Sequence, residues 1–304
     1  MSHIYIYSPS SAVRDRKAAR RGIARLKALG HEVEIDEDAF ATHMRFAGDD
    51  ATRLAAIHRA CASGADIALI TRGGYGLTRL LPQIRTKAVA RAVERGTHFV
   101  GLSDFTAFQG AVMASTGATT WAGPALGEDF GVEGDADEIM LACFDDLALG
   151  QAEGSGWQLP RSEARDRLLH TRGTLWGGNL SVLTSLLGTP YMPQPQAGIL
   201  FLEDVHEHPY RVERMLTQLL HAGVLARQKA ILLGQFTNYR LAPHDKGYKL
   251  QTVVDWLRAQ VKKVPVFTNL PFGHVTTKVL LPVGSEVELA VEGRDALIVW
   301  GHRH

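Results

Sequence analysis

Ser103 is the residue in this sequence best placed to do chemistry. It follows the apolar, strand-like residues Phe99 and Val100 within the stretch Gly101–Phe105, after which the pattern becomes helical. A serine at a sharp turn from strand to helix projects its hydroxyl out of the sheet beside the next backbone N–H, as a nucleophile requires. The match to the nucleophile-elbow pattern is partial, because Phe105 stands where that pattern has its second glycine. Serine also caps helices, so this stretch alone leaves both interpretations open.

Three other stretches carry residue types that could assist such a hydroxyl. The loop Arg72–Gly76 could cradle a phosphate or an oxyanion with its backbone N–H groups, or it could be a tight turn. Glu203 and Asp204 end an apolar run and could be an acid/base pair or a solvated helix start. His274 follows Pro-Phe-Gly and carries no signal by itself.

The histidines and cysteines do not form a metal-binding pattern. His206 and His208 could point the same way only in an extended segment, and a third ligand is not evident. Cys61 and Cys143 are far apart and suggest neither a metal site nor a disulfide framework. We therefore expect no metal and no cofactor.

Strand-like and helix-like segments alternate along the first half, which argues for a parallel sheet covered by helices on both faces. In such sheets ligands bind beyond the carboxyl ends of the strands, where the glycine-rich loop and Ser103 both stand. The expected strands are 4–7, 31–35, 67–70 and 99–100, and the expected helices are 14–29, 52–63 and 87–95.

An acidic, glycine-rich stretch, 127–156, separates this half from a second one. We expect an N-terminal domain at 1–140, a linker at 141–165 and a C-terminal domain at 166–304. The second half shows strands at 198–205 and 230–236 and helices at 210–221 and 253–261, followed by a β-rich tail.

Composition narrows the class of protein. The chain has 304 residues, 45% of them hydrophobic and 21% charged, with a net charge of +1. These values are typical of a globular protein and give no sign of a nucleic-acid partner. The sequence shows no signal-peptide pattern and no apolar run of ~20 residues, so we expect no membrane segment and a cytoplasmic location.

Taken together, the sequence resembles the LD-carboxypeptidase family of serine peptidases, which includes the microcin C immunity peptidases. Six segments, in the family's order between residues 71 and 282, carry the resemblance: Thr71–Gly76 with Arg79–Pro82, Gly101–Thr106, Gly177–Leu180 with Gly188–Tyr191, Leu200–Val205, Pro209–Leu216 and Leu270–His274. This sequence departs from the family pattern at Leu102, where an aromatic residue is common in the family.

The resemblance implies a catalytic triad of Ser103, His274 and Glu203. A serine hydroxyl is a weak nucleophile until a base takes its proton, and a carboxylate must hold that base in one tautomer. The resemblance further implies an oxyanion hole at the backbone N–H groups of Gly74 and Asp104. Arg72, Tyr75 and Asn179 are candidates for substrate contacts. The implied fold is α/β, with a Rossmann-like (flavodoxin-like) domain and a smaller C-terminal domain, commonly as a homodimer.

The resemblance therefore predicts a cytoplasmic LD-carboxypeptidase of murein recycling that releases D-alanine from a muropeptide tetrapeptide through an acyl-enzyme. A microcin-type acyl-nucleotide peptidase is the alternative within the family. In that branch the resemblance places a base-stacking tryptophan on the helix after Gly177–Leu180, whereas Ser181–Leu187 contains no aromatic residue. A non-catalytic small-molecule binding protein and a plain α/β-hydrolase are the alternatives outside it.

Overall fold

The computed structural model describes residues 1–163 and 168–301. The first of its two sheets has six strands in the order β11-β5-β4-β3-β1-β2. The order of the five parallel strands is that of flavodoxin-like folds, and β11 joins β5 antiparallel. The predicted α/β fold with a Rossmann-like domain is thus confirmed. The strands are β1 (His3–Tyr7), β2 (Glu32–Ile35), β3 (Ile67–Ile70), β4 (His98–Gly101), β5 (Thr120–Ala122) and β11 (Leu281–Val283).

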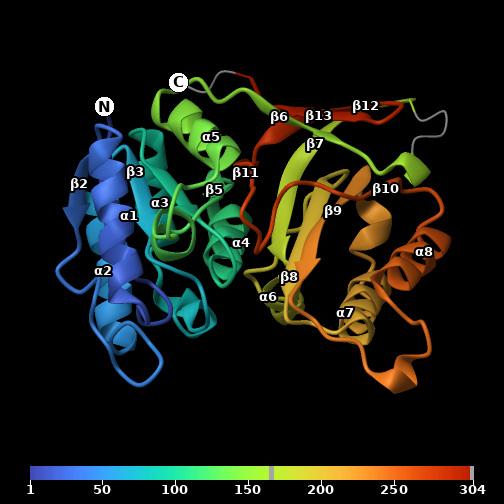
Figure 1. The fold of residues 1–304 in the computed structure, drawn as a ribbon, viewed down its shortest axis with the longest axis horizontal. Helices are drawn as coiled ribbons and strands as arrows, with labels where there is room; N and C mark the ends of the chain where they lie inside the picture. Colours follow the sequence, from blue (N-terminus) through green and yellow to red (C-terminus); the bar gives the residue numbers. More distant parts are fainter. Residues whose placement is uncertain (164–167, 302–304) are drawn as a thin grey trace.

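Helices cover both faces of this sheet (Figure 1). Successive strand residues point to opposite faces, so Ile4 and Ile6 join one apolar cluster while Tyr5 and Tyr7 join another. Helices α1 and α5 pack on the first face and α2, α3 and α4 on the second. Their bounds are α1 (Arg16–Ala28), α2 (Asp50–Ala62), α3 (Thr86–Glu94), α4 (Phe105–Thr116) and α5 (Glu138–Ala148).

The second sheet has seven strands in the order β10-β9-β8-β7-β12-β13-β6. The first four are parallel to one another, and the remaining pairs are antiparallel. The strands are β6 (Gly154–Gln158), β7 (Leu168–Asn179), β8 (Ile199–Val205), β9 (Ala230–Thr237), β10 (Val266–Phe267), β12 (Glu286–Glu292) and β13 (Asp295–Val299). The helices are α6 (Leu180–Ser185), α7 (Pro209–His221) and α8 (Leu250–Gln260).

The segment expected to be a linker, 141–165, contains regular structure in its described part. It holds most of helix α5, which buries Phe144 and Leu147, and strand β6, which pairs with β13. Strand β11 in turn returns from the second half of the chain to the edge of the first sheet. Because the chain crosses between the sheets in this way, the domain limits at 140 and 166 stay a prediction.

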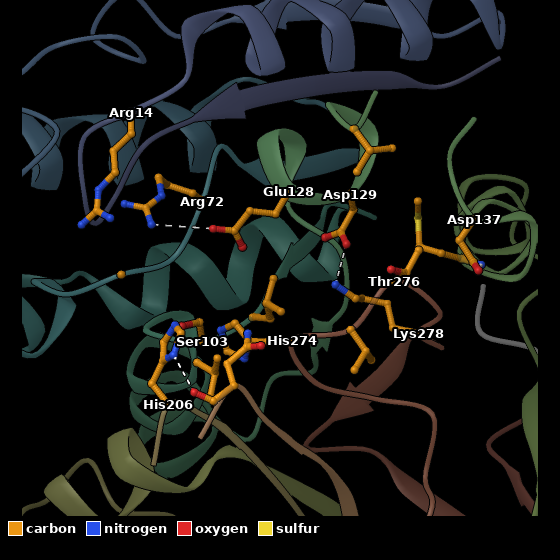
Figure 2. Close-up of a pocket in the computed structure, with 17 residues that line it drawn as sticks. Arg14, Arg72, Ser103, Glu128, Asp129, Asp137, His206, His274, Thr276 and Lys278 are labelled. Atoms are coloured by element: carbon orange, nitrogen blue, oxygen red, sulfur yellow. Dashed lines mark hydrogen bonds and ion pairs between the residues drawn. The ribbon is translucent and has the colours of Figure 1, made fainter. Parts of the chain in front are cut away.

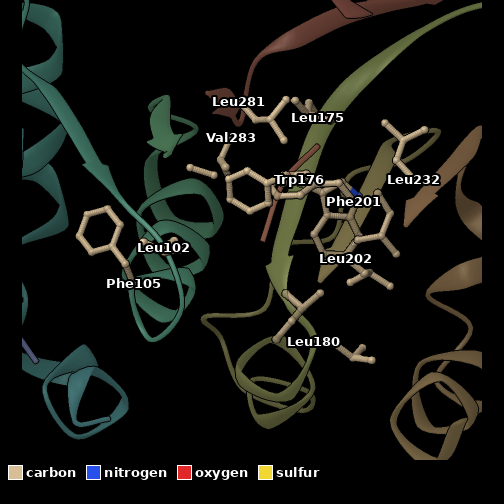
Figure 3. Packing of buried hydrophobic residues seen from close by; sticks show 14 of the residues in the cluster. Leu102, Phe105, Leu175, Trp176, Leu180, Phe201, Leu202, Leu232, Leu281 and Val283 are labelled. Atoms are coloured by element: carbon tan, nitrogen blue, oxygen red, sulfur yellow. The ribbon is translucent and has the colours of Figure 1, made fainter. Parts of the chain in front are cut away.

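One continuous apolar cluster joins the two halves (Figure 3). Leu102 and Phe105, at the start of α4, belong to it together with Trp176 on β7, Phe201 on β8 and Val283 on β11. All five side chains are at most 2% exposed. Burying a large apolar side chain is worth about 1.5–3 kcal/mol, so this shared core fixes the turn that carries Ser103 relative to the second sheet.

Candidate active site

Ser103 lies in the turn between β4 and α4, with its backbone in the left-handed region at φ 65°. A non-glycine residue in that region costs of order 1–3 kcal/mol, and such strain is concentrated at functional sites. Gly73 gives the serine its space, because a Cβ on Gly73 would lie 2.6 Å from Ser103 Cβ. The Ser103 hydroxyl has no hydrogen bond to any described residue, so in this structure it does not cap helix α4.

His274 is held by Glu203 in the second half of the chain. Its Nδ1 lies 2.8 Å from Glu203 Oε2, and the two side chains are 17% and 0% exposed. Burial alone would lower the pKa of the imidazole, but the hydrogen bond and the negative charge of Glu203 outweigh it and raise the pKa. Gly273 allows this approach, since it has φ 135° and a Cβ there would lie 3.1 Å from Glu203 Oε2.

Asn179 binds the other oxygen of the Glu203 carboxylate. Its Nδ2 donates to Glu203 Oε1 over 3.1 Å and to Asp204 Oδ1 over 3.0 Å. Burial, followed by the charge of Glu203, raises the pKa of Asp204 to about 6. Asn179 is 4% exposed and holds the Glu203 carboxylate, and its contact with substrate stays a prediction.

Two backbone N–H groups near the serine make no backbone hydrogen bond to the described residues. Neither the N–H of Gly74 nor that of Asp104 has an acceptor among the described residues. The Asp104 side chain instead fixes the loops: it accepts from Ser10 Oγ and, over 2.9 Å, from the N–H of Leu77. Burial raises the pKa of this carboxyl, against the effect of both hydrogen bonds.

A cleft of about 510 Å³ brings residues of the two halves together. Figure 2 shows Ser103 and His274 on its wall, with ionic side chains opposite. Gly74 and Arg72 also line it. No hydrogen bond joins the Ser103 hydroxyl to the His274 ring in the described ranges, so that contact stays a prediction. Three predicted residues, Ser103, His274 and Gly74, nevertheless line this cleft, and Glu203 is bonded to His274 behind its wall.

Tyr75 lies away from this cleft. The centroid of its ring lies 6.1 Å from the ring centroid of Phe46. The guanidinium carbon of Arg45 lies 5.5 Å from the same Tyr75 centroid. It lines a separate pocket together with residues of helix α6. The Tyr75 side chain thus points into a different pocket from the cleft that Gly74 lines.

Several cleft residues carry no motif that sequence reasoning could detect. Arg14, Glu128, Asp129, Asp137 and Lys278 all line the cavity. Lys278 and Asp129 form a buried ion pair, each no more than 4% exposed by its side chain. Glu128 and Asp129 belong to the acidic, glycine-rich stretch 127–156. Its composition indicated a boundary between the two halves of the chain and no functional site.

His206 and His208 take different partners. His206 Nδ1 lies 3.1 Å from the carbonyl oxygen of Asn238, and His208 Nε2 lies 3.1 Å from Asp245 Oδ2. His206 lines the cleft, whereas His208 caps helix α7. Within the described ranges no group of three or more histidine, cysteine or acidic side chains is arranged to hold a metal ion. No described helix is long and apolar enough to cross a bilayer.

Comparison with known proteins places this geometry in a family. The family model of the LD-carboxypeptidase N-terminal domain matches residues 4–123. The family model of the LD-carboxypeptidase C-terminal domain matches residues 172–289. A muramoyltetrapeptide carboxypeptidase from Oxalobacter formigenes is 38% identical, with a TM-score of 0.88 over 99% of this chain and 100% of its own. A murein tetrapeptide carboxypeptidase of Pseudomonas aeruginosa is 27% identical over 94% of this chain and 92% of its own.

The fold extends to a more distant relative. The microcin C7 self-immunity protein MccF, in complex with aspartyl sulfamoyl adenosine, has a TM-score of 0.84 over 98% of this chain and 95% of its own. At 24% identity this likeness concerns the fold alone. The family models and the Oxalobacter structure, by contrast, cover the serine turn, strand β8 with Glu203 and the loop with His274. The chain therefore belongs to the LD-carboxypeptidase family of serine peptidases and is a hydrolase.

Proposed function

We propose that this chain is an LD-carboxypeptidase that releases the terminal D-alanine from murein tetrapeptides. The observation that carries the proposal is the buried Glu203–His274 pair, whose histidine lines the same cleft as Ser103. Two relatives bear the names muramoyltetrapeptide and murein tetrapeptide carboxypeptidase, which supports this substrate. The scissile bond is the L,D amide between diaminopimelate and D-alanine.

In the first half of the reaction Ser103 Oγ attacks the carbonyl carbon of that amide. His274 Nε2 takes the hydroxyl proton, while Glu203 holds Nδ1–H and stabilises the imidazolium that forms. The N–H groups of Gly74 and Asp104 donate to the oxyanion, each contributing about 3 kcal/mol to the stability of the transition state. His274 then gives its proton to the amide nitrogen, the C–N bond breaks, and D-alanine leaves.

The second half returns the enzyme to its starting state. His274 takes a proton from water, whose oxygen attacks the acyl-enzyme carbonyl. The same oxyanion donors stabilise the second tetrahedral intermediate. As that intermediate collapses, the proton on His274 passes to Ser103 Oγ and the tripeptide leaves with a new carboxylate.

The cell-biological setting follows from the substrate. Tetrapeptides of this kind arise when murein is broken down, and we propose that the chain acts in the cytoplasm on these recycled fragments. The homodimer implied by the family resemblance also stays a prediction, and sedimentation of the purified chain measures it.

The experiment is incubation of the purified chain with muramyl tetrapeptide and with the tripeptide, followed by mass spectrometry. We expect D-alanine release from the tetrapeptide and no change in the tripeptide. Ser103→Ala, His274→Ala and Glu203→Ala should each lose most turnover, and double variants should be scarcely worse because the three groups act as one unit. Ser185→Ala, an exposed serine on helix α6, is the matched control.

A second substrate separates the two activities known in this fold. Aspartyl sulfamoyl adenosine should be cleaved much more slowly than the tetrapeptide, because helix α6 offers no aromatic face for a base, worth about 1–3 kcal/mol. Faster cleavage of the adenosine compound would reject the murein substrate and leave the triad standing. Full turnover by Ser103→Ala would reject the serine mechanism itself.

A further inference from the structure

The guanidinium of Arg72 lies in the cleft wall with few of its donors satisfied. It donates no hydrogen bond to any residue in the described ranges, although its side chain is only 17% exposed. Its Nη1 is buried without a partner. Guanidinium groups have five N–H donors and seldom lack partners when buried. A group left in this condition at a cleft wall indicates a ligand that supplies the missing acceptors.

The position of Arg72 specifies where that ligand binds. The residue follows β3 and stands two positions before Gly74, whose N–H is one of the proposed oxyanion donors. Its Nη1 would lie 3.4 Å from a Cβ built on Gly74, so the guanidinium packs against Gly74. An anion bound by Arg72 must therefore be close to the carbonyl that Ser103 attacks.

The charges nearby favour an anion at this end of the cleft. Arg14 lies beside Arg72 (Figure 2) and makes no ion pair or hydrogen bond to a described residue. Burial is the main cause that lowers the pKa of Arg72. The negative charge of Glu128 opposes this shift, and the positive charge of Arg14 adds to it. Glu128 Oε1 is 3.7 Å from Arg72 Nη2 and 43% exposed, so it is too distant for a hydrogen bond and can turn to solvent.

The acidic side chains at the other end are already engaged. Lys278 pairs with Asp129, and Thr277 Oγ1 donates to Asp137 Oδ2 over 2.6 Å. Arg14 has no ion-pair partner among the described residues and Arg72 has only Glu128, so this end of the cleft keeps a positive charge. A carboxylate suits them, because its two oxygens match the fork of a guanidinium.

We propose that Arg72, with Arg14 beside it, binds the terminal carboxylate of the substrate and so restricts cleavage to the last residue of the peptide. This inference rests on the proposed function. In a peptide only one nitrogen and one Cα separate a terminal carboxylate from the preceding carbonyl carbon, a span under ~4 Å. A guanidinium packed against Gly74 therefore reaches that carboxylate when the last amide is at Ser103. At an internal amide, a neutral carbonyl would face the two arginines.

The test compares a tetrapeptide ending in D-alanine with the same peptide ending in D-alanine amide. Release of D-alanine or its amide is followed by mass spectrometry for the wild type, Arg72→Gln, Arg72→Lys and the control Arg20→Gln. Arg20 is exposed on helix α1 and remote from the cleft lining. We expect the wild type and the control to prefer the acid in kcat/KM by at least ~30-fold, as when one partner of a buried charge pair is removed.

Arg72→Gln should lose most of this preference, and Arg72→Lys should keep part of it, because lysine retains the charge without the fork. Equal slowing of both peptides in Arg72→Gln would show that Arg72 only supports the loop and would overturn the inference. Equal cleavage of both peptides by the wild type would overturn it too, while the proposed function would stand.

Absence of turnover on either peptide would overturn the proposed function, and binding then decides the inference. Calorimetry with Ser103→Ala should show tighter binding of the acid than of the amide, and the difference should vanish in Ser103→Ala/Arg72→Gln. Equal binding of the two peptides, or no binding of either, would overturn the carboxylate site.

Discussion

The backbone N–H of Asn179 donates to Thr106 Oγ1 over 3.0 Å. Thr106 belongs to the first turn of helix α4, directly after Ser103, while the Asn179 side chain holds Glu203. This one residue thus connects the helix of the nucleophile to the acid behind His274. Both Thr106 and Asn179 are at most 4% exposed, so water cannot replace either contact without structural change.

Thr106→Val should destabilise the protein with little change in volume. Without the hydroxyl, the N–H of Asn179 becomes a buried donor without a partner, which costs about 1–3 kcal/mol. Urea unfolding followed by circular dichroism measures this loss. Thr106→Ser keeps the acceptor and should retain most of the stability; an equal loss in both variants would assign the effect to the missing methyl group.

Asn179→Leu should reduce turnover more than substrate binding. It removes the donor to Glu203 Oε1 and leaves two adjacent carboxylates, Glu203 and Asp204, without the amide they share. Misplacing the acid weakens its hold on the His274 tautomer, so we expect a fall of at least ~10-fold in kcat, of the kind that positioning errors cause. Ser181→Ala is the control, because only the backbone N–H of Ser181 reaches Asp204. A pure KM effect would return Asn179 to the role of a substrate contact.

The rate should rise with pH through the titration of His274. The imidazole must be neutral to accept the serine proton, and its pKa lies above the ordinary value of 6.5 despite burial, because Glu203 stabilises the charged form. The limb of kcat/KM is therefore expected above pH ~6.5. Glu203→Gln removes the negative charge and should move the limb to lower pH, with a lower maximum. A limb that shifts in Asp204→Asn but stays in Glu203→Gln would belong to Asp204 instead.

Lys278→Met should destabilise the protein by about 3–5 kcal/mol, because it leaves the buried Asp129 carboxylate without its cation. Burial already raises the pKa of Asp129, with Lys278 opposing the rise. A carboxyl that binds its proton more tightly in the folded state loses stability as pH increases, so the cost should be larger at pH 8 than at pH 5. Unfolding in guanidinium chloride at both values measures it. The double variant Lys278→Met/Asp129→Asn should recover much of the loss; no recovery would point to lost packing of the lysine stem.

Local pattern was enough to predict much of the fold. The apolar run 67–70 coincides with β3, and the helix expected at 210–221 is α7, which buries Val212, Met215, Leu216 and Leu219 as its periodicity predicts. The turn at Ser103 was also predictable, since the change from strand to helix occurs within a few residues. Strand β6 and helix α5 were missed, because an acidic and glycine-rich composition hides the few buried residues that fix them.

The sequence by itself determined the α/β alternation, the family and the residues of the proposed triad, because these depend on short stretches of chain. Only the tertiary structure decided that Asn179 supports Glu203, that Tyr75 turns away from the cleft and that Lys278 pairs with Asp129, which is 149 positions away. It also left Nη1 of Arg72 without a hydrogen-bond partner beside Gly74. Such pairings depend on how two sheets pack through a shared core, and no local spacing encodes the distance between side chains brought together by that packing.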